Sequence, residues 1–352
     1  MMNMNYKFSV IIILLFSIFF FELEYAFTVK ESKTHRLLLR CKKKCQNKNI
    51  KSKRFCKKCH SLGMFNKNEM LEKKNSLVML SNSSKFDYNK IENLIVFGDS
   101  HSTVLTNFTD MSYTGWNFSG GKNWPLYLID FNNIKLWNYA VRGAYINKKF
   151  SKFVNNIDLE KQYTYYYENM SEGKQFSNVW NKYNSLYVFW FGTCDIGWRI
   201  KGTNKEIIEN LFNVIKRIYD VGARNILILG APPLYRIPYR KNYNQCKGIS
   251  DGECIEVLKK EVLEFNNEII KLSKIFFKKY SYMNLIYYST VNIFEDIIKN
   301  CYEYGFKDCI NSWGGNKKRN VSDFFWANSH ISYPANKILA KNINELLNSL
   351  NK

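Results

Sequence analysis

Strand-like and helix-like stretches alternate along most of this chain, and this alternation constrains its fold more than any other feature. Strands separated by helices predict a parallel sheet that is covered on both faces. Residues 147–183, rich in Tyr and Asn, predict an irregular loop or short helices. The predicted strands are Leu94–Phe97, Lys135–Tyr139, Leu186–Phe191, Asn225–Leu229 and Asn284–Tyr288, and the predicted helices are Lys205–Val221, Ile255–Tyr280, Val291–Lys299 and Pro334–Leu350.

The first predicted strand ends abruptly in a tight turn with reactive side chains. Ile95–Phe97 suits a buried strand, and Gly98 lets the backbone turn sharply before Asp99 and Ser100. Ligands of open α/β sheets bind at the carboxyl ends of strands, so Ser100 is a candidate nucleophile if a base lies nearby. The alternative is a turn with an ordinary exposed hydroxyl. Asp99 is expected to brace this turn through its own backbone.

Three further segments place small or reactive residues after strands. Residues 138–144 and 191–197 each follow a predicted strand, and residues 325–330 end in His330. Because the carboxyl ends of parallel strands lie at one edge of a sheet, we expect these segments to converge with the turn at Ser100.

The ordered set of segments resembles the SGNH hydrolases, also called GDSL lipases/esterases, and most closely their secreted fungal and plant-like branch. The resemblance covers residues 93–350. It implies a flavodoxin-like α/β/α sandwich with a mainly parallel sheet, and ester hydrolysis through an acyl-enzyme. The matching residues are Phe97-Gly98-Asp99-Ser100, Asn138-Tyr139-Ala140 with Gly143-Ala144, Gly192-Thr193-Cys194-Asp195-Ile196-Gly197, and Phe325-Trp326 before His330.

The resemblance also assigns roles to individual residues. It implies that Ser100 is the nucleophile, that His330 is its base, and that the backbone N–H groups of Ser100 and Gly143 are oxyanion donors. The chemistry is consistent with these residue types, since a Ser hydroxyl is a poor nucleophile until an imidazole takes its proton. Loss of one oxyanion donor typically lowers the rate by about a hundred- to a thousandfold.

Two positions depart from the family pattern. The third oxyanion donor of the family is an Asn, and Cys194 stands there with a weakly donating thiol. The family's third triad member is an Asp three residues before the His, and Ala327 stands there. His330 therefore lacks its usual orienter, which Asp323 or Asn328 would have to replace.

These departures leave two functions open. The first is a secreted serine ester hydrolase, for example an acetylesterase, that acts on acylated carbohydrate or lipid. The second is a weakened or inactive relative that binds such a ligand. No cofactor or metal is expected at the site. The tryptophans that could hold sugar rings or acyl chains, or simply pack in the core, are Trp116, Trp124, Trp190 and Trp198.

The N-terminus has the pattern of a secretory signal peptide over residues 1–26. Lys7 precedes an apolar run from Val10 to Phe21, and Ala26 is a suitable small residue for cleavage. The alternative is a membrane anchor. Secretion would permit disulfides and glycosylation. The candidate glycosylation sites are Asn82, Asn107, Asn117, Asn169 and Asn320.

Residues 27–92 form a predicted basic extension before the hydrolase domain at 93–352. In a secreted chain its four cysteines favour two disulfides, although their spacing also resembles a zinc site. The formal charge of +22 comes with no nucleic-acid-binding motif, so no nucleic-acid partner is expected. An acidic polymer or surface is a possible partner of this segment. Its cysteines are Cys41, Cys45, Cys56 and Cys59.

Five cysteines lie in the predicted hydrolase domain. The closely spaced pairs Cys246/Cys254 and Cys301/Cys309 could each close a short loop, which would leave Cys194 unpaired. The connectivity is not determined by the sequence, which is also silent on the oligomeric state.

Overall fold

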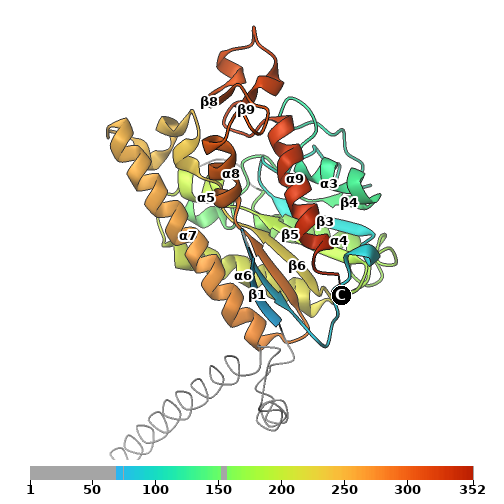
Figure 1. Ribbon diagram of the computed structural model, residues 1–352. Helices are drawn as coiled ribbons and strands as arrows, with labels where there is room; N and C mark the ends of the chain where they lie inside the picture. The colour runs from blue at the N-terminus through green and yellow to red at the C-terminus, as the bar shows by residue number, and fades with distance from the viewer. Residues whose placement is uncertain (1–68, 74, 152–156, 352) are drawn as a thin grey trace, which may run out of the picture. The chain divides into compact units, whose positions relative to one another are not determined.

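A seven-stranded sheet, in the order β1-β2-β7-β6-β5-β3-β4, lies at the centre of the described structure (Figure 1). The structure is a computed structural model that describes residues 69–73, 75–151 and 157–351. The strands of the sheet are β1 (Glu69–Lys73), β2 (Ser76–Leu80), β3 (Asn93–Gly98), β4 (Lys135–Asn138), β5 (Ser185–Trp190), β6 (Asn225–Leu229) and β7 (Asn284–Tyr288).

Five neighbouring strands run parallel, in the order β4-β3-β5-β6-β7. This is the flavodoxin-like order, in which the chain first adds a strand on one side of β3 and then continues on its other side. Strands β3, β5, β6 and β7 are buried along their whole lengths, as is typical of parallel strands with both faces covered. The predicted fold class, with its mainly parallel sheet, is confirmed.

Helices cover both faces of the sheet. Figure 1 shows α3 and α9 on one side and α6 and α7 on the other, and α4 packs beside α6. The apolar face predicted around Ile207 and Leu211 of α6 is buried. The helices are α3 (Trp124–Asn132), α4 (Leu159–Met170), α5 (Thr193–Gly197), α6 (Asn204–Asp220), α7 (Asp251–Lys279), α8 (Thr290–Lys299) and α9 (Tyr333–Asn348), and a small separate sheet joins β8 (Asp308–Ser312) to β9 (Phe324–Trp326).

The sheet begins earlier in the chain than the predicted domain boundary at residue 93. Strands β1 and β2 come from within the predicted extension 27–92, and β2 pairs antiparallel with β7. The compact unit therefore starts at Glu69. The short apolar run of β2 was not recognised in the sequence because the residues before it are strongly charged. Residues 77–80 of this strand are buried beside β7.

Helix α4 lies in the stretch for which the Tyr-rich composition predicted only a loop or short helices. Asp158 caps its first turn by accepting a hydrogen bond from the N–H of Lys161. Gln162 and Tyr166 are buried on one face of the helix, four residues apart. The helical period was obscured because this buried face contains polar residue types.

The two predicted cysteine pairs are confirmed as disulfides, Cys246–Cys254 and Cys301–Cys309, and Cys194 is a buried free thiol. The four cysteines of the basic segment and the predicted signal peptide lie outside the described residues. Within the described ranges, no helix is long and apolar enough to cross a membrane.

The turn after β3 is held by close contacts at Gly98. Its N–H donates to Gln162 Oε1 at 3.0 Å, and its carbonyl accepts from Gln162 Nε2 at 2.8 Å. A Cβ atom at this position would lie 2.8 Å from the Trp190 carbonyl oxygen. Only glycine fits there, because that oxygen belongs to the neighbouring strand β5 and cannot move independently.

We expect Gly98→Ala to lower the free energy of unfolding by about 1–3 kcal/mol, because the added methyl group overlaps the backbone of β5. Urea unfolding measures this change. Gly252→Ala is the matched control, since a Cβ at Gly252 in the first turn of α7 meets no atom within 4 Å. Equal stability of the two variants would contradict the packing argument.

Candidate active site

The structure brings together Ser100 and His330, which are 230 residues apart in the chain. His330 Nε2 lies 2.7 Å from Ser100 Oγ, within hydrogen-bond reach. Ser100 is in the turn after β3, and His330 is in the loop between β9 and α9. This is the juxtaposition that a nucleophile and its general base require.

Asn328 is the orienting partner of the imidazole. Its Oδ1 lies 2.6 Å from His330 Nδ1 and also accepts the His330 backbone N–H at 2.9 Å. Its Nδ2 donates to the Phe118 carbonyl at 3.1 Å. These backbone partners determine which way the amide faces, so Oδ1 accepts from Nδ1–H. The proton of the neutral ring is therefore on Nδ1, and Nε2 is free to accept from Ser100.

Asp323, the other candidate orienter, does not contact His330. Its carboxylate faces Lys307 Nζ at 3.0 Å and Arg319 Nε at 3.7 Å. Asp323 precedes β9, and its oxygens pair with these cations near β8 rather than reaching back to the imidazole. Ala327 is buried, and its backbone N–H donates to the His330 carbonyl, so it supports the loop without supplying a third group.

The N–H groups of Ser100 and Gly143 are available as oxyanion donors. Among the described residues, neither of them donates a hydrogen bond. The loop with Gly143 is held beside the nucleophile turn, because Val141 N donates to the Gly98 carbonyl at 3.1 Å. Gly143 adopts a φ of 73°, a left-handed conformation that favours glycine.

The buried carboxyl groups of Asp195 and Asp99 stabilise the loops around the site. Asp195 Oδ1 accepts from Ile146 N at 2.8 Å and Oδ2 accepts from Gly192 N at 3.1 Å, so one side chain links both loops. Asp99 accepts from His101 N at 2.9 Å, as expected for a turn brace. Burial raises the pKa of Asp99 and the pKa of Asp195 to about 7 each.

Cys194 occupies the position of the family's third oxyanion donor, in the first turn of α5. Burial, with smaller contributions from the neighbouring Asp99 and Asp195, raises the pKa of its thiol well above the ordinary value. The thiol therefore stays protonated, and its S–H is a weak donor at best.

Two rings that the sequence did not suggest flank His330. Phe118 stacks on the imidazole with ring centroids 4.6 Å apart, and the ring of His101 lies 4.9 Å away on a tilted plane. His101 is buried, which lowers its pKa to about 4. Burial, with smaller contributions from His101 and the nearby Arg142, holds the pKa of His330 well below its ordinary value. The imidazole is therefore a neutral base at physiological pH.

A cleft of about 1260 Å³ is lined in part by the loop that holds Gly143, although Ser100, Gly143 and His330 are not among its lining residues. Arg142, next to Gly143, lines it, and the Arg142 guanidinium lies 5.4 Å from the Phe118 ring centroid. Trp116 is the one tryptophan of the four candidates that lines the cleft. Trp124 and Trp190 are buried in the core, and Trp198 packs against Tyr243.

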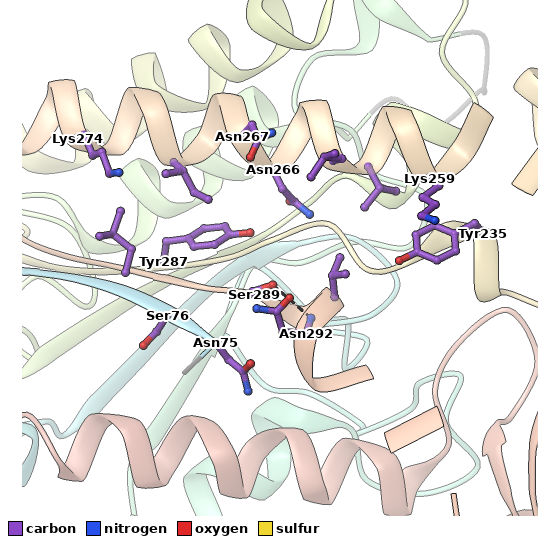
Figure 2. Close-up of a pocket in the computed structure, with 15 residues that line it drawn as sticks. Asn75, Ser76, Tyr235, Lys259, Asn266, Asn267, Lys274, Tyr287, Ser289 and Asn292 are labelled. Atoms are coloured by element: carbon purple, nitrogen blue, oxygen red, sulfur yellow. Dashed lines mark hydrogen bonds between the residues drawn. The ribbon is translucent and has the colours of Figure 1, made fainter. Parts of the chain in front are cut away.

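A second cavity of about 430 Å³ lies elsewhere, between α7, β7 and α8 (Figure 2). Asn266 and Lys259 of α7 and Tyr287 of β7 contribute to its lining. The side-chain amide of Asn266 already forms hydrogen bonds with the N–H and the carbonyl of Ala231. None of the reacting groups lies in this cavity. Among the described residues, no cluster of three or more His, Cys, Asp or Glu is arranged to hold a metal ion.

The chain is similar to several known proteins. Residues 94–343 match the family model described as GDSL-like lipase/acylhydrolase. An acetylesterase of Thermothelomyces thermophilus is 29% identical over 169 residues, which cover 41% of this chain and 55% of that protein. A GDSL esterase/lipase of Arabidopsis thaliana is 26% identical over 192 residues, 48% of this chain and 50% of that protein. The chain thus spans about half the length of these curated relatives.

Among solved structures, a carbohydrate acetylesterase from Sinorhizobium meliloti aligns with a TM-score of 0.42 and 13% sequence identity. The alignment covers 74% of this chain and 99% of that one.

We expect the acid limb of kcat/KM to lie below pH 6.5, since the lowered pKa of His330 keeps the base neutral down to more acidic pH. Asn328→Asp places a carboxylate on Nδ1, which favours imidazolium, so the limb moves to higher pH. The measurement is the pH profile of ester hydrolysis. The readout is the midpoint of the acid limb and not kcat. An Asp at this position no longer donates to the Phe118 carbonyl, and this loss affects kcat as well.

Asn328→Ala removes the orienter and should lower kcat by about a hundredfold or more. Ser329→Ala is the control, because Ser329 Oγ is 3.3 Å from the same Nδ1 and is the more distant partner. A larger loss of kcat in Ser329→Ala than in Asn328→Ala would show that Ser329, and not Asn328, orients the imidazole.

Proposed function

The chain belongs to the GDSL-like lipase/acylhydrolase family of ester hydrolases, and on this premise we propose that it is a serine ester hydrolase. It cleaves acyl esters of carbohydrate or lipid through an acyl-enzyme on Ser100. The observation that supports this most directly is the continuous hydrogen-bonded row Ser100–His330–Asn328.

In the proposed reaction, Ser100 Oγ attacks the ester carbonyl while its proton moves to His330 Nε2. The N–H groups of Ser100 and Gly143 stabilise the oxyanion of the tetrahedral intermediate. The C–O bond to the alcohol then breaks, and the imidazolium protonates the departing alkoxide. Water attacks the acyl-enzyme with His330 again as base, and the acid is released as Ser100 regains its proton.

The imidazolium formed during each step has only a neutral amide on Nδ1. Asn328 orients the ring and fixes its tautomer, but it does not provide the charge that a carboxylate would. Ester turnover is therefore expected to be slower than with a complete triad. The second candidate, a binding protein for acylated carbohydrate or lipid with little turnover, is supported by this same missing charge.

We also propose that the protein is secreted after cleavage of residues 1–26. In that case the exposed Asn107 and Asn320 are better glycosylation sites than Asn169, whose Nδ2 already donates to the Phe108 carbonyl at 2.8 Å. N-terminal sequencing of protein collected from the medium of a eukaryotic host should start just after Ala26. Retention in the membrane fraction with an intact N-terminus would favour the anchor instead.

The purified protein should hydrolyse p-nitrophenyl acetate, and Ser100→Ala should abolish that activity because the acyl group has no acceptor. A fluorophosphonate probe should label Ser100 in the wild type, as peptide mass spectrometry would show, and His330→Ala should slow the labelling by a thousandfold or more. Inert wild-type protein that still binds an acylated ligand would favour the binding protein.

A further inference from the structure

We propose that the cleft beside the site accepts the long apolar acyl chain of a lipid-type ester, rather than serving an acetyl group on a sugar. This inference deepens the proposed hydrolase function and depends on it. The cleft is larger than the range of about 300–1,000 Å³ usual for small-molecule pockets. Its lining is mainly apolar and includes Phe108, Leu126, Ile129 and Val141.

The cleft lies beside the loop that holds Gly143, although Ser100, Gly143 and His330 do not themselves line it. Val141 and Arg142 line it and lead directly into Gly143, a candidate oxyanion donor. Trp116, which also lines the cleft, contacts Phe118 edge-on with centroids 4.7 Å apart, and Phe118 stacks on His330. The acyl chain is the part of an ester that matches this apolar lining, so the proposal places it in the cleft while the ester carbonyl lies at Ser100.

Large apolar side chains are exposed at the rim of the cleft. Leu105 is 56% exposed, Trp116 is 50% exposed and Tyr113 is 38% exposed, and all three line the cleft. Apolar groups gathered around a cavity mouth indicate a site that contacts an apolar partner.

The backbone at Leu105 supports the same conclusion. Its φ is 54°, in the left-handed region that a branched side chain such as Leu rarely adopts. The conformation is maintained by a small hairpin, in which Thr106 pairs with Tyr113 and Gly115 N donates to the Val104 carbonyl at 3.0 Å. Neither burial nor local backbone preference accounts for a leucine at this position, whereas contact with an acyl chain does.

The test compares kcat/KM for p-nitrophenyl octanoate and p-nitrophenyl acetate. Each methylene that leaves water contributes roughly a factor of four, so the wild type should prefer octanoate by at least about tenfold. Leu105→Asn should lower that preference about tenfold. Because Asn tolerates the left-handed conformation, this variant should not lower the melting temperature, so a loss of preference reports on binding and not on folding.

Ile275→Asn is the matched control, since Ile275 on α7 is 54% exposed and does not line the cleft. It should leave both rates unchanged. A wild type that hydrolyses acetate as well as octanoate, or a Leu105→Asn variant with unchanged preference, overturns the acyl-chain inference while leaving the hydrolase function intact. Absence of turnover of either ester, with no labelling of Ser100, would instead be a failure of the proposed function itself.

Discussion

The hydrogen bond between Asn328 and His330 Nδ1 is the contact on which the chemistry of this site depends. It places the ring proton on Nδ1 and leaves Nε2 as the acceptor for Ser100. The surroundings favour the neutral ring, since burial, and to a smaller extent His101 and the cation of Arg142, lower the pKa of the imidazole. Nε2 is therefore placed to accept a proton from Ser100, while the environment disfavours the imidazolium that would result.

Other buried polar side chains near the site connect its loops. Asp195 joins the loops at Ile146 and Gly192, while Asn138 donates to the Ser102 carbonyl at 2.7 Å and accepts from Ala140 N at 2.8 Å. These side chains tie together the loops after three different strands. The N–H groups of Ser100 and Gly143, the proposed oxyanion donors, consequently lie on loops that are already connected in the absence of an ester, which is the condition under which such donors are most effective.

Much of the fold could be predicted because the central strands are short apolar runs whose limits are set by flanking polar residues and turns. Strands β6 and β7 have the predicted limits. Strand β2 was not predicted, and α4 was expected only as part of an irregular loop or short helices, because their burial depends on distant partners and their composition gives a weak local signal. The order of the motifs was enough to pair Ser100 with His330. The choice of Asn328 over Asp323 was not predictable, since it depends on where a loop turns and on the cations beside β8.

The loop that holds His330 is attached to a part of the chain stabilised by covalent chemistry. Cys301, just after α8, is bonded to Cys309 in β8, and β8 pairs with β9, which leads into that loop. Gly314 N further donates to the Ala327 carbonyl at 2.8 Å. The placement of the imidazole is thereby linked to the redox conditions of the compartment in which the chain matures. In a thiol-rich environment, reduction of the Cys301–Cys309 disulfide would make the position of His330 less fixed, although no residue that contacts the ester would be altered.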